Sequence, residues 1–229
     1  MAAHLITGAG SGIGAVLAER LAERGDDLWL LARDARRAAE LRERFPGAQT
    51  LVGDLGDPAK LSWALGHQAL PVELDSLLHV AGMVELGAVG ELPVKAWQST
   101  LAVNLVAPAE LTRLLLPSLR LVKGHVVFVN SGAGLSASAE WSAYAASKHG
   151  LKALADALRQ EEHANGVRVT SVYPGRTATA MQAKVHQQEG KAYDEERFIA
   201  PESVVKAILA ALDASRDAEL TDITVRPGR

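Results

Sequence analysis

The chain has 229 residues, of which 48% are hydrophobic, and this length and composition predict one globular domain with a sizeable core. Lys and Arg number 24 against 27 Asp and Glu, and only 4% of the residues are aromatic, so the chain lacks the basic excess and the stacking side chains of a nucleic-acid-binding protein. It has no cysteine, which excludes disulfides, thiolate metal sites and a cysteine nucleophile.

Apolar stretches of strand length alternate with amphipathic stretches of helix length along the chain. Strands are predicted at Ala3–Thr7, Leu28–Ala32, Ala48–Val52, Ser76–Val80, His125–Asn130, Val167–Val172 and Asp222–Val225. Helices are predicted around Ile13, Val16, Leu17 and Leu21, and at Asp34–Phe45, Val94–Leu119 and Tyr144–Glu162. This alternation predicts an α/β fold, a doubly wound, mostly parallel seven-stranded Rossmann-type sheet with helices on both faces, in a single domain over residues 1–229.

The segment Arg176–Ile199 departs from this alternation. It is polar and charged, and its few apolar residues are too scattered to define a core face. An irregular segment of this length inside a compact domain is more often functional than idle. We therefore expect a substrate lid at residues 176–199, with a plain surface excursion as the alternative.

Membrane and export signals are not expected in this sequence. The most apolar stretch, Leu111–Val122, is interrupted by two arginines and a proline, and no apolar run reaches 18 residues. The first residues show no basic region followed by a long apolar stretch, which a signal peptide would have. We expect no membrane association and a cytoplasmic location.

A glycine-rich turn, Thr7-Gly8-Ala9-Gly10-Ser11-Gly12-Ile13-Gly14, joins the first predicted strand to the first predicted helix. Glycines allow a sharp turn and a close approach of the backbone to a pyrophosphate, whose charge the free N–H groups of the helix start would face. Glycines also serve ordinary tight turns, but a strand before and a helix after are the context that the dinucleotide motif requires. The turn therefore predicts a dinucleotide site.

The residues after the second strand indicate which dinucleotide binds. An acidic residue there binds the ribose 2′-hydroxyl of NAD, whereas an arginine accommodates the 2′-phosphate of NADP. Arg33 stands at the strand end, 19 residues beyond Gly14, and the adjacent Asp34 is explained as the N-cap of the next helix. We therefore predict NADP(H) in preference to NAD(H), which remains the alternative.

Tyr144 and Lys148 open the helix Tyr144–Glu162 and, being four residues apart, share one of its faces. A neighbouring cation favours the phenolate, which would lower the tyrosine pKa from about 10 toward the working range of an acid–base catalyst. Ser131 precedes Tyr144 by 13 residues and ends a predicted strand, at the edge of a parallel sheet where ligands bind. The Tyr–Lys spacing alone is weak evidence, because solvated pairs on any helix show it.

The glycine-rich turn, Ser131, Tyr144 and Lys148 occur in the order and at the separations of the short-chain dehydrogenase/reductase family, which the sequence resembles over essentially its whole length. The resemblance implies NAD(P)-dependent hydride transfer between nicotinamide and a small carbonyl or alcohol substrate. It also implies a homodimer or homotetramer, in which the long helices Val94–Leu119 and Tyr144–Glu162 pair with a second subunit.

The resemblance also implies roles for individual residues. Tyr144 corresponds to the catalytic acid/base, Lys148 to the lysine that lowers its pKa and holds the nicotinamide ribose, and Ser131 to the serine that orients the carbonyl. Asn104 corresponds to the asparagine that completes a proton relay through a water. The cofactor contacts, Arg33 and the turn included, are Gly8, Ser11, Gly12, Ile13, Gly14, Arg33, Asp54, Leu55, Ala81, Gly82, Tyr144, Lys148, Pro174, Gly175, Thr177 and Thr179. The histidines lack metal-site spacing, so no metal is expected.

Three features depart from the family's pattern. After the fourth strand the family usually has Asn-Asn-Ala-Gly, whereas this chain has His79-Val80-Ala81-Gly82, so a side-chain hydrogen bond from the second position is lost or comes from the backbone. We interpret His79 as a buried structural histidine. Thr177 occupies a usually apolar position, which leaves open whether it or Thr179 meets the cofactor. The turn also lacks the basic residue of many NADP-preferring members.

Two other functions remain open. A non-catalytic dinucleotide-binding sensor or scaffold needs the glycine turn but not the set Asn104, Ser131, Tyr144 and Lys148. An epimerase or dehydratase of the same fold usually carries an added C-terminal substrate domain, for which this chain leaves no residues. The substrate is not predicted: the segments Gly82–Gly90 and Leu135–Trp141 are expected to line its pocket, and they carry no charge cluster that demands a carboxylate or phosphate.

Overall fold

The computed structural model describes residues 1–228 and contains one sheet of seven strands, all parallel, in the order β3-β2-β1-β4-β5-β6-β7. The strands are β1 (Ala3–Thr7), β2 (Asp27–Ala32), β3 (Gln49–Val52), β4 (Ser76–His79), β5 (His125–Val129), β6 (Arg168–Pro174) and β7 (Asp222–Val225). Every predicted strand is present, with ends that shift by two residues at most. The predicted α/β fold is confirmed.

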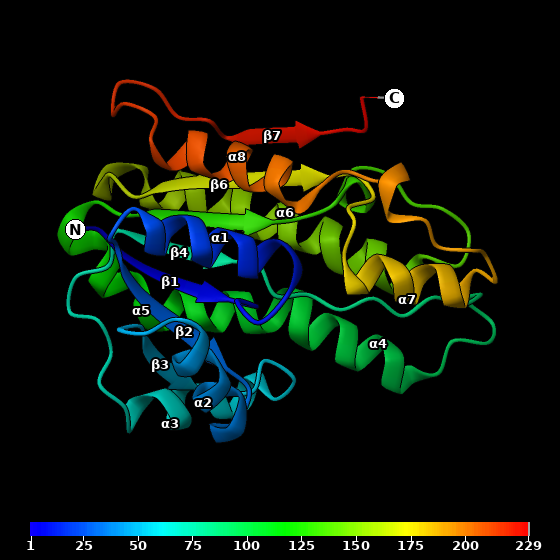
Figure 1. Cartoon of the computed structure of the whole chain (residues 1–229), viewed down its shortest axis with the longest axis horizontal. Coiled ribbons are helices and arrows are strands. Elements are labelled where there is room, and N and C mark those ends of the chain that lie inside the picture. Colours follow the sequence, from blue (N-terminus) through cyan, green and yellow to red (C-terminus); the bar gives the residue numbers. More distant parts are fainter. Residues whose placement is uncertain (229) are drawn as a thin grey trace.

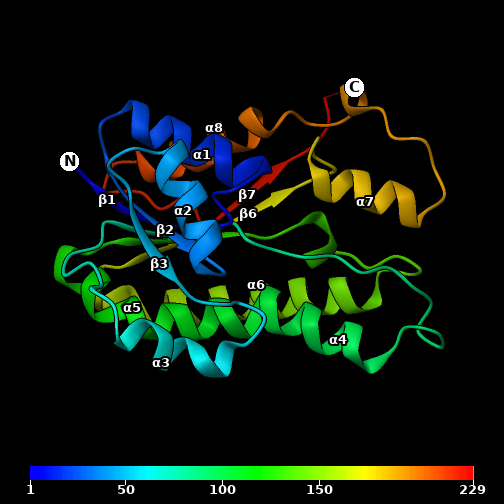
Figure 2. The same ribbon diagram turned by 60° about the horizontal axis from the view of Figure 1, so that its bottom comes forward.

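Helices cover both faces of the sheet. One layer holds α1 (Gly12–Glu23), α2 (Ala35–Arg44) and α8 (Pro201–Leu212), and the other holds α3 (Leu61–Gly66), α4 (Val94–Leu101), α5 (Ala107–Val122) and α6 (Ser142–Glu162) (Figures 1 and 2). The predicted helix Val94–Leu119 is divided into α4 and α5 by a π-helical turn, Ala102–Val106. The sequence did not predict α3, α8 or α7 (Ala180–Gln188), which lies beyond the carboxyl ends of the strands (Figure 1).

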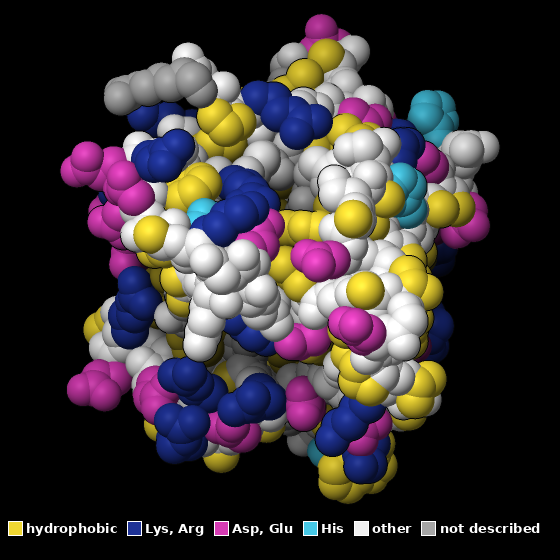
Figure 3. All heavy atoms as spheres, turned by 90° about the vertical axis from the view of Figure 1, so that its right-hand side faces the viewer, with side chains coloured by type: hydrophobic (Ala, Val, Ile, Leu, Met, Phe, Trp, Pro, Cys, Tyr) yellow, Lys and Arg dark blue, Asp and Glu magenta, His cyan; other side chains and the backbone are white. Residues whose placement is uncertain are grey.

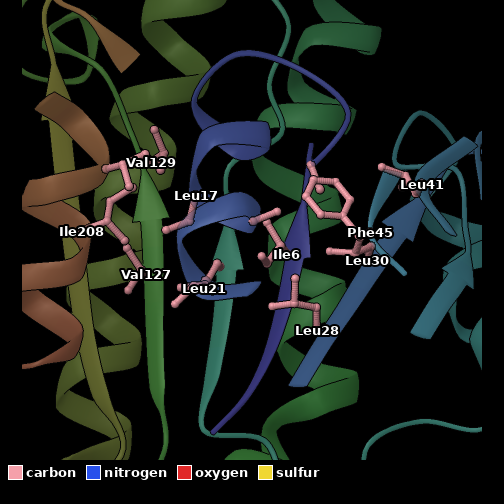
Figure 4. Packing of buried hydrophobic residues seen from close by; sticks show 14 of the residues in the cluster. Ile6, Leu17, Leu21, Leu28, Leu30, Leu41, Phe45, Val127, Val129 and Ile208 are labelled. Carbon is pink, nitrogen blue, oxygen red and sulfur yellow. The ribbon is translucent and has the colours of Figure 1, made fainter. Parts of the chain in front are cut away.

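The core consists of two apolar layers, one on each side of the sheet. Figure 4 shows the layer under α1 and α8, where Leu17 and Leu21 lie beside Ile6 of β1, and Ile208 lies beside Val127 of β5. Burying a leucine side chain contributes about 2 kcal/mol, so these contacts hold the helix starts firmly at the strand ends. The packed core therefore fixes the positions of the loops at the carboxyl edge of the sheet, where the strands end and the helices begin.

The segment Arg176–Ile199 is more ordered than its sequence indicates. Thr179 caps α7 by accepting a hydrogen bond from the Gln182 N–H, and Val185 on that helix packs against Val84 and Tyr144. The rings of His186, Tyr193 and Phe198 lie within 6 Å of one another, centre to centre. As expected, the apolar residues of the segment share no helix face: Val185 is buried, Met181 is 36% exposed, and the half-buried Tyr193 and Phe198 meet through the fold of the segment.

Among the helices of residues 1–228, none combines the length and the apolar character that a bilayer crossing requires.

Candidate active site

A cleft of about 770 Å³ opens at the carboxyl edge of the sheet. It lies where the strand order reverses, because the chain builds outward from β1 to β3 and then returns to place β4 on the other side of β1. In open α/β sheets this switch point is where ligands bind. Figure 3 shows this end of the molecule, with hydrophobic side chains visible near the centre and charged side chains around them.

The glycine-rich turn forms one wall of the cleft and presents unpaired backbone N–H groups. Ser11 is the N-cap of α1, but its side chain makes no capping hydrogen bond, and the first helical bond runs from Ala15 N to Ser11 O. The N–H groups of Gly12, Ile13 and Gly14 precede that bond and have no partner within the helix. Together with the positive end of the helix dipole, they form a site for a phosphate group.

Two glycines of the turn are required by close contacts. A Cβ on Gly14 would lie 2.2 Å from the carbonyl oxygen of Gly8. Gly8 itself has φ +76°, and a Cβ there would lie 2.9 Å from the Cα of Ala81, in the segment after β4. The turn is therefore packed against the β4 end, and a side chain at either position would push it out of place. These contacts and the free N–H groups fit the pyrophosphate of a dinucleotide.

Thr7 fixes the segment after β4, a role that the sequence reasoning missed. Its hydroxyl oxygen accepts hydrogen bonds from the N–H groups of Val80 and Ala81, both at 3.0 Å. The hydroxyl thus holds the backbone at the position where Val80 replaces the usual asparagine. The signal was a threonine at the last position of β1, directly opposite the end of β4.

His79 lies away from the cleft. Its Nε2 pairs with the Thr112 hydroxyl at 2.9 Å, and its ring stacks on Phe128 at 4.9 Å. Burial, with a contribution from the Lys148 charge, lowers the pKa of His79 to about 3. The ring is therefore neutral at pH 7 and satisfied in the core, in agreement with the structural interpretation.

Ser131 is held at the end of β5 by its neighbour Asn130. The Asn130 amide oxygen accepts from the Ser131 N–H at 2.9 Å, and its NH₂ group donates to the Lys148 carbonyl at 3.1 Å. The Ser131 hydroxyl oxygen accepts from the Ala133 N–H at 3.1 Å, so it caps the 3₁₀ turn Gly132–Gly134. Asn130, which the sequence reasoning also missed, ties the strand end to the helix that carries Tyr144.

Tyr144 and Lys148 lie on α6, and both line the cleft although they are almost fully buried. Lys148 Nζ is 5.9 Å from the centre of the Tyr144 ring and donates to the Val129 carbonyl at 3.0 Å. Burial lowers the pKa of Lys148 to about 8. Ser131, Tyr144 and Lys148 therefore meet at one wall of the cleft, as the sequence predicts.

The electrostatics of Tyr144 differ from the sequence expectation. Burial raises its pKa, and the hydrogen bond with the Ser131 side chain only partly offsets this effect. The cation does not lower the pKa here because desolvation of the phenolate dominates, while the ammonium group binds a backbone carbonyl. The phenol is therefore protonated at neutral pH in the cofactor-free protein.

Asn104 lies behind the cleft, in the π-helical turn between α4 and α5. Its amide oxygen accepts from the Met83 N–H at 2.8 Å, and its NH₂ group donates to the Met83 carbonyl at 2.8 Å and to Ser147 Oγ at 3.0 Å. The Ser147 hydroxyl in turn donates to the Tyr144 carbonyl at 2.7 Å. Asn104 thus connects the segment after Gly82 to α6, and π-helical turns are frequent at functional sites.

The loop after β6 supplies the remaining wall. Pro174, Gly175, Thr177 and Thr179 all line the cleft. The Thr177 hydroxyl is turned back onto the Gly175 carbonyl at 3.0 Å, whereas the Thr179 methyl group lies 3.1 Å from the place of a Cβ on Gly12. Of the two threonines, Thr179 is therefore the one that contacts the glycine turn.

Three predicted cofactor contacts lie outside the cleft wall. The Arg33 side chain is 65% exposed and lies 3.5 Å from Asp34, which caps α2 by accepting from the Arg37 N–H. Asp54 is exposed, its carboxylate accepts from the Gly56 N–H, and the half-buried Leu55 follows it. These residues follow β2 and β3, at the same edge of the sheet as the cleft.

Comparison with known proteins agrees with this geometry. Residues 2–190 match the family model described as short chain dehydrogenase. The chain is 29% identical to an uncharacterised oxidoreductase of Staphylococcus saprophyticus, over 97% of this chain and 96% of that protein. It is 33% identical to dehydrogenase/reductase SDR family member 7B of Bos taurus, over 95% of this chain and 73% of that protein.

Solved structures share the whole fold. A 4-hydroxyisoleucine dehydrogenase complexed with NADH superposes with a TM-score of 0.84 at 24% identity, covering 100% of this chain and 98% of that one. A closed form of serine dehydrogenase complexed with NADP⁺ superposes with a TM-score of 0.85 at 21% identity, covering 97% and 94%. The chain belongs to the short-chain dehydrogenase/reductase family and is an NAD(P)-dependent oxidoreductase.

Proposed function

We propose that the protein transfers hydride reversibly between a nicotinamide cofactor and a small carbonyl or alcohol substrate, with Ser131, Tyr144 and Lys148 as catalytic residues. The observation that carries this proposal is that all three side chains line one cleft, which the glycine-rich turn also lines. The bound cofactor supplies the hydride, and the protein supplies orientation and the proton.

Tyr144 is suited to give the proton to the reduced substrate. Burial raises the pKa of its phenol and keeps it protonated at neutral pH, and the Ser131 side chain is near enough to offset part of this rise in pKa. A substrate carbonyl oxygen between the two hydroxyls would accept from both, and the phenol would protonate it as negative charge develops. The Lys148 ammonium group, 5.9 Å from the ring centre, is the cation that would stabilise the phenolate left behind once the phenol has given up its proton. Asn104 acts as a positioning residue through Met83 and Ser147.

Residues that line the same cleft would also bind the cofactor. The N–H groups of Gly12, Ile13 and Gly14 would bind the pyrophosphate, and Tyr144 and Lys148 would hold the nicotinamide ribose. Arg33 favours NADP(H) over NAD(H), because no structural partner other than Asp34 occupies its guanidinium among residues 1–228.

Residues 176–199 would close over the substrate, and the long helices would pair in a homodimer or homotetramer. The cytoplasmic location expected from the sequence is likewise a prediction.

A screen of purified protein with NADPH and NADH against ketones, aldehydes and quinones tests this proposal. We expect carbonyl-dependent oxidation of NADPH, with a weaker rate for NADH. Tight cofactor binding without oxidation by any carbonyl compound would contradict it and favour the sensor or scaffold function.

A further inference from the structure

Arg226 adds a positive charge to the cleft that neither the sequence reasoning nor the mechanism uses. It follows the last residue of β7, and its side chain lines the same cleft as Ser131 and Tyr144. Its Nη1 lies 2.9 Å from the place that a Cβ on Gly132 would occupy, so the guanidinium reaches the residue next to Ser131. The absence of a side chain at Gly132 is what permits this approach.

The backbone holds the base of this side chain in place. Val225 is paired with Pro174 in the last rung of the β6–β7 ladder, and its carbonyl accepts from the Gly175 N–H at 2.8 Å. On the other side of Arg226, the ring of Pro227 lies 3.2 Å from the place of a Cβ on Gly175. Arg226 is therefore anchored to the loop that forms the cleft wall, although its side chain is exposed.

The charges of the cleft leave Arg226 without a partner. Of the six charged residues that line it, four are cations and two are acids: Lys148, Arg176, Lys191 and Arg226 against Glu140 and Glu189. Glu189 is neutralised by Arg176 at 2.5 Å and by Lys191 at 3.2 Å. Lys148 donates to the Val129 carbonyl. Within residues 1–228, the Arg226 side chain makes no hydrogen bond and no ion pair. The carboxylate of Glu140, the other acid that lines the cleft, is also too far from Arg226 to form an ion pair.

We infer that Arg226 selects substrates in which the reacting carbonyl or alcohol carries an anionic carboxylate or phosphate group. A guanidinium offers a planar pair of N–H donors that matches either oxyanion, and such charge-assisted hydrogen bonds are among the stronger ones. Because Arg226 lies beside Ser131, the anion and the reacting oxygen of one short molecule can bind together. This inference rests on the proposed function, since it concerns the substrate of the same site.

Matched pairs of carbonyl compounds test the inference. Cofactor oxidation is measured with acetoacetate against methyl acetoacetate, and with dihydroxyacetone phosphate against dihydroxyacetone, for the wild type and for Arg226→Leu, Arg226→Lys and Arg216→Leu. Arg216→Leu is the control, because Arg216 is an exposed arginine that precedes β7 and lines none of the cleft. The first pair reports on a carboxylate and the second on a phosphate.

In at least one pair we expect the anionic member to have a kcat/KM about tenfold or more above that of its neutral partner, a ratio that corresponds to one charged contact. Arg226→Leu should remove this preference by lowering kcat/KM for the anionic member far more than for its neutral partner, Arg226→Lys should retain part of it, and Arg216→Leu should keep all of it. Turnover without an anion preference, or a preference that survives Arg226→Leu, overturns the inference and leaves the proposed function intact.

A binding measurement separates failure of the inference from failure of the proposed function. Butanoate, butanamide and inorganic phosphate are titrated calorimetrically into the cofactor-loaded wild type and Arg226→Leu. If no carbonyl compound is turned over, the proposed function fails. In that case, binding of butanoate or phosphate that depends on Arg226, without binding of butanamide, still supports an anion site, and its absence overturns the inference.

Discussion

The residues around Tyr144 and those around Arg33 lie at the same edge of the sheet but differ in how firmly the fold holds them. Tyr144, Lys148 and Asn104 are 7%, 3% and 1% exposed, and hydrogen bonds to backbone groups fix the lysine and the asparagine. The Arg33 side chain is 65% exposed and has one acidic neighbour, Asp34. The groups proposed to act in catalysis are thus preorganised, whereas the residue expected to select the cofactor is free to move.

This difference separates two functional properties. Preorganised groups act on the transition state with little reorganisation, so their loss should affect the rate strongly. An exposed guanidinium forms its contacts only when the ligand arrives, and the ordering of its side chain offsets part of their free energy. The first group should therefore control turnover, and the second should control which dinucleotide binds.

Tyr144→Phe should have the largest effect. It removes the proton donor but keeps the ring, so we expect kcat to fall about 10³-fold, within the range of general acid catalysis. The dissociation constant of the cofactor, measured by fluorescence titration, should stay within about threefold of the wild-type value. Rates near those of the wild type would contradict the assignment of Tyr144 as the acid.

Asn104→Ala should loosen the residues around Tyr144, because it removes the amide that bonds to Met83 and Ser147. It leaves the N–H and carbonyl of Met83 and the Ser147 hydroxyl without their partner, which should cost about 3 kcal/mol of unfolding free energy and lower Tm by roughly 6–12 °C. If Asn104 acts by positioning, kcat should fall more than KM changes, and Asn104→Asp, which keeps the acceptor oxygen, should recover part of both losses. Calorimetry and steady-state kinetics measure the two effects.

Lys148→Met should slow turnover, by less than Tyr144→Phe does, yet stabilise the fold at neutral pH. Burial lowers the Lys148 pKa from 10.5 to about 8, so at pH 7 the folded protein holds a buried charge at a cost of up to about 3 kcal/mol. The unfolded chain binds this proton up to pH 10.5 and the folded chain only up to about 8, so the cost disappears as pH rises between these values. Urea unfolding at pH 7 and pH 10 should show the full gain at pH 7 and only a small part of it at pH 10.

Equal stability of the Lys148→Met variant and the wild type at pH 7 would mean that the ammonium group is solvated rather than buried. A loss of stability at pH 7 would indicate that its bond to the Val129 carbonyl outweighs the cost of burial. Either result would weaken the contrast between a preorganised and an exposed region.

Arg33→Ala should have the smallest effect, confined to one cofactor. We expect KM for NADPH to rise about tenfold while KM for NADH stays constant, because only NADPH carries the 2′-phosphate. Arg42→Ala, on the helix α2 that follows Arg33, is the control, since Arg42 already donates to the Thr50 hydroxyl. An equal change for both cofactors, or none, would contradict the predicted role of Arg33.

The sequence predicted the strands and the proximity of Tyr144 to Lys148 because their signals are local. Apolar runs define buried strands, and Tyr144 and Lys148 share a helix face by spacing alone. Thr7, Asn130 and Arg226 were missed because each acts on a segment that is distant in the chain or bonds to backbone groups, which no pattern of residue types reveals. The raised pKa of Tyr144 was missed for a related reason, since desolvation depends on packing from several elements.

A crystal structure of the protein with NADPH tests the central claim, the convergence of catalysis and cofactor on this cleft, most directly. We expect the pyrophosphate at the N–H groups of Gly12–Gly14, the nicotinamide ribose at Tyr144 and Lys148, and the 2′-phosphate near Arg33. A dinucleotide bound elsewhere, or one whose nicotinamide lies away from Ser131 and Tyr144, would contradict it.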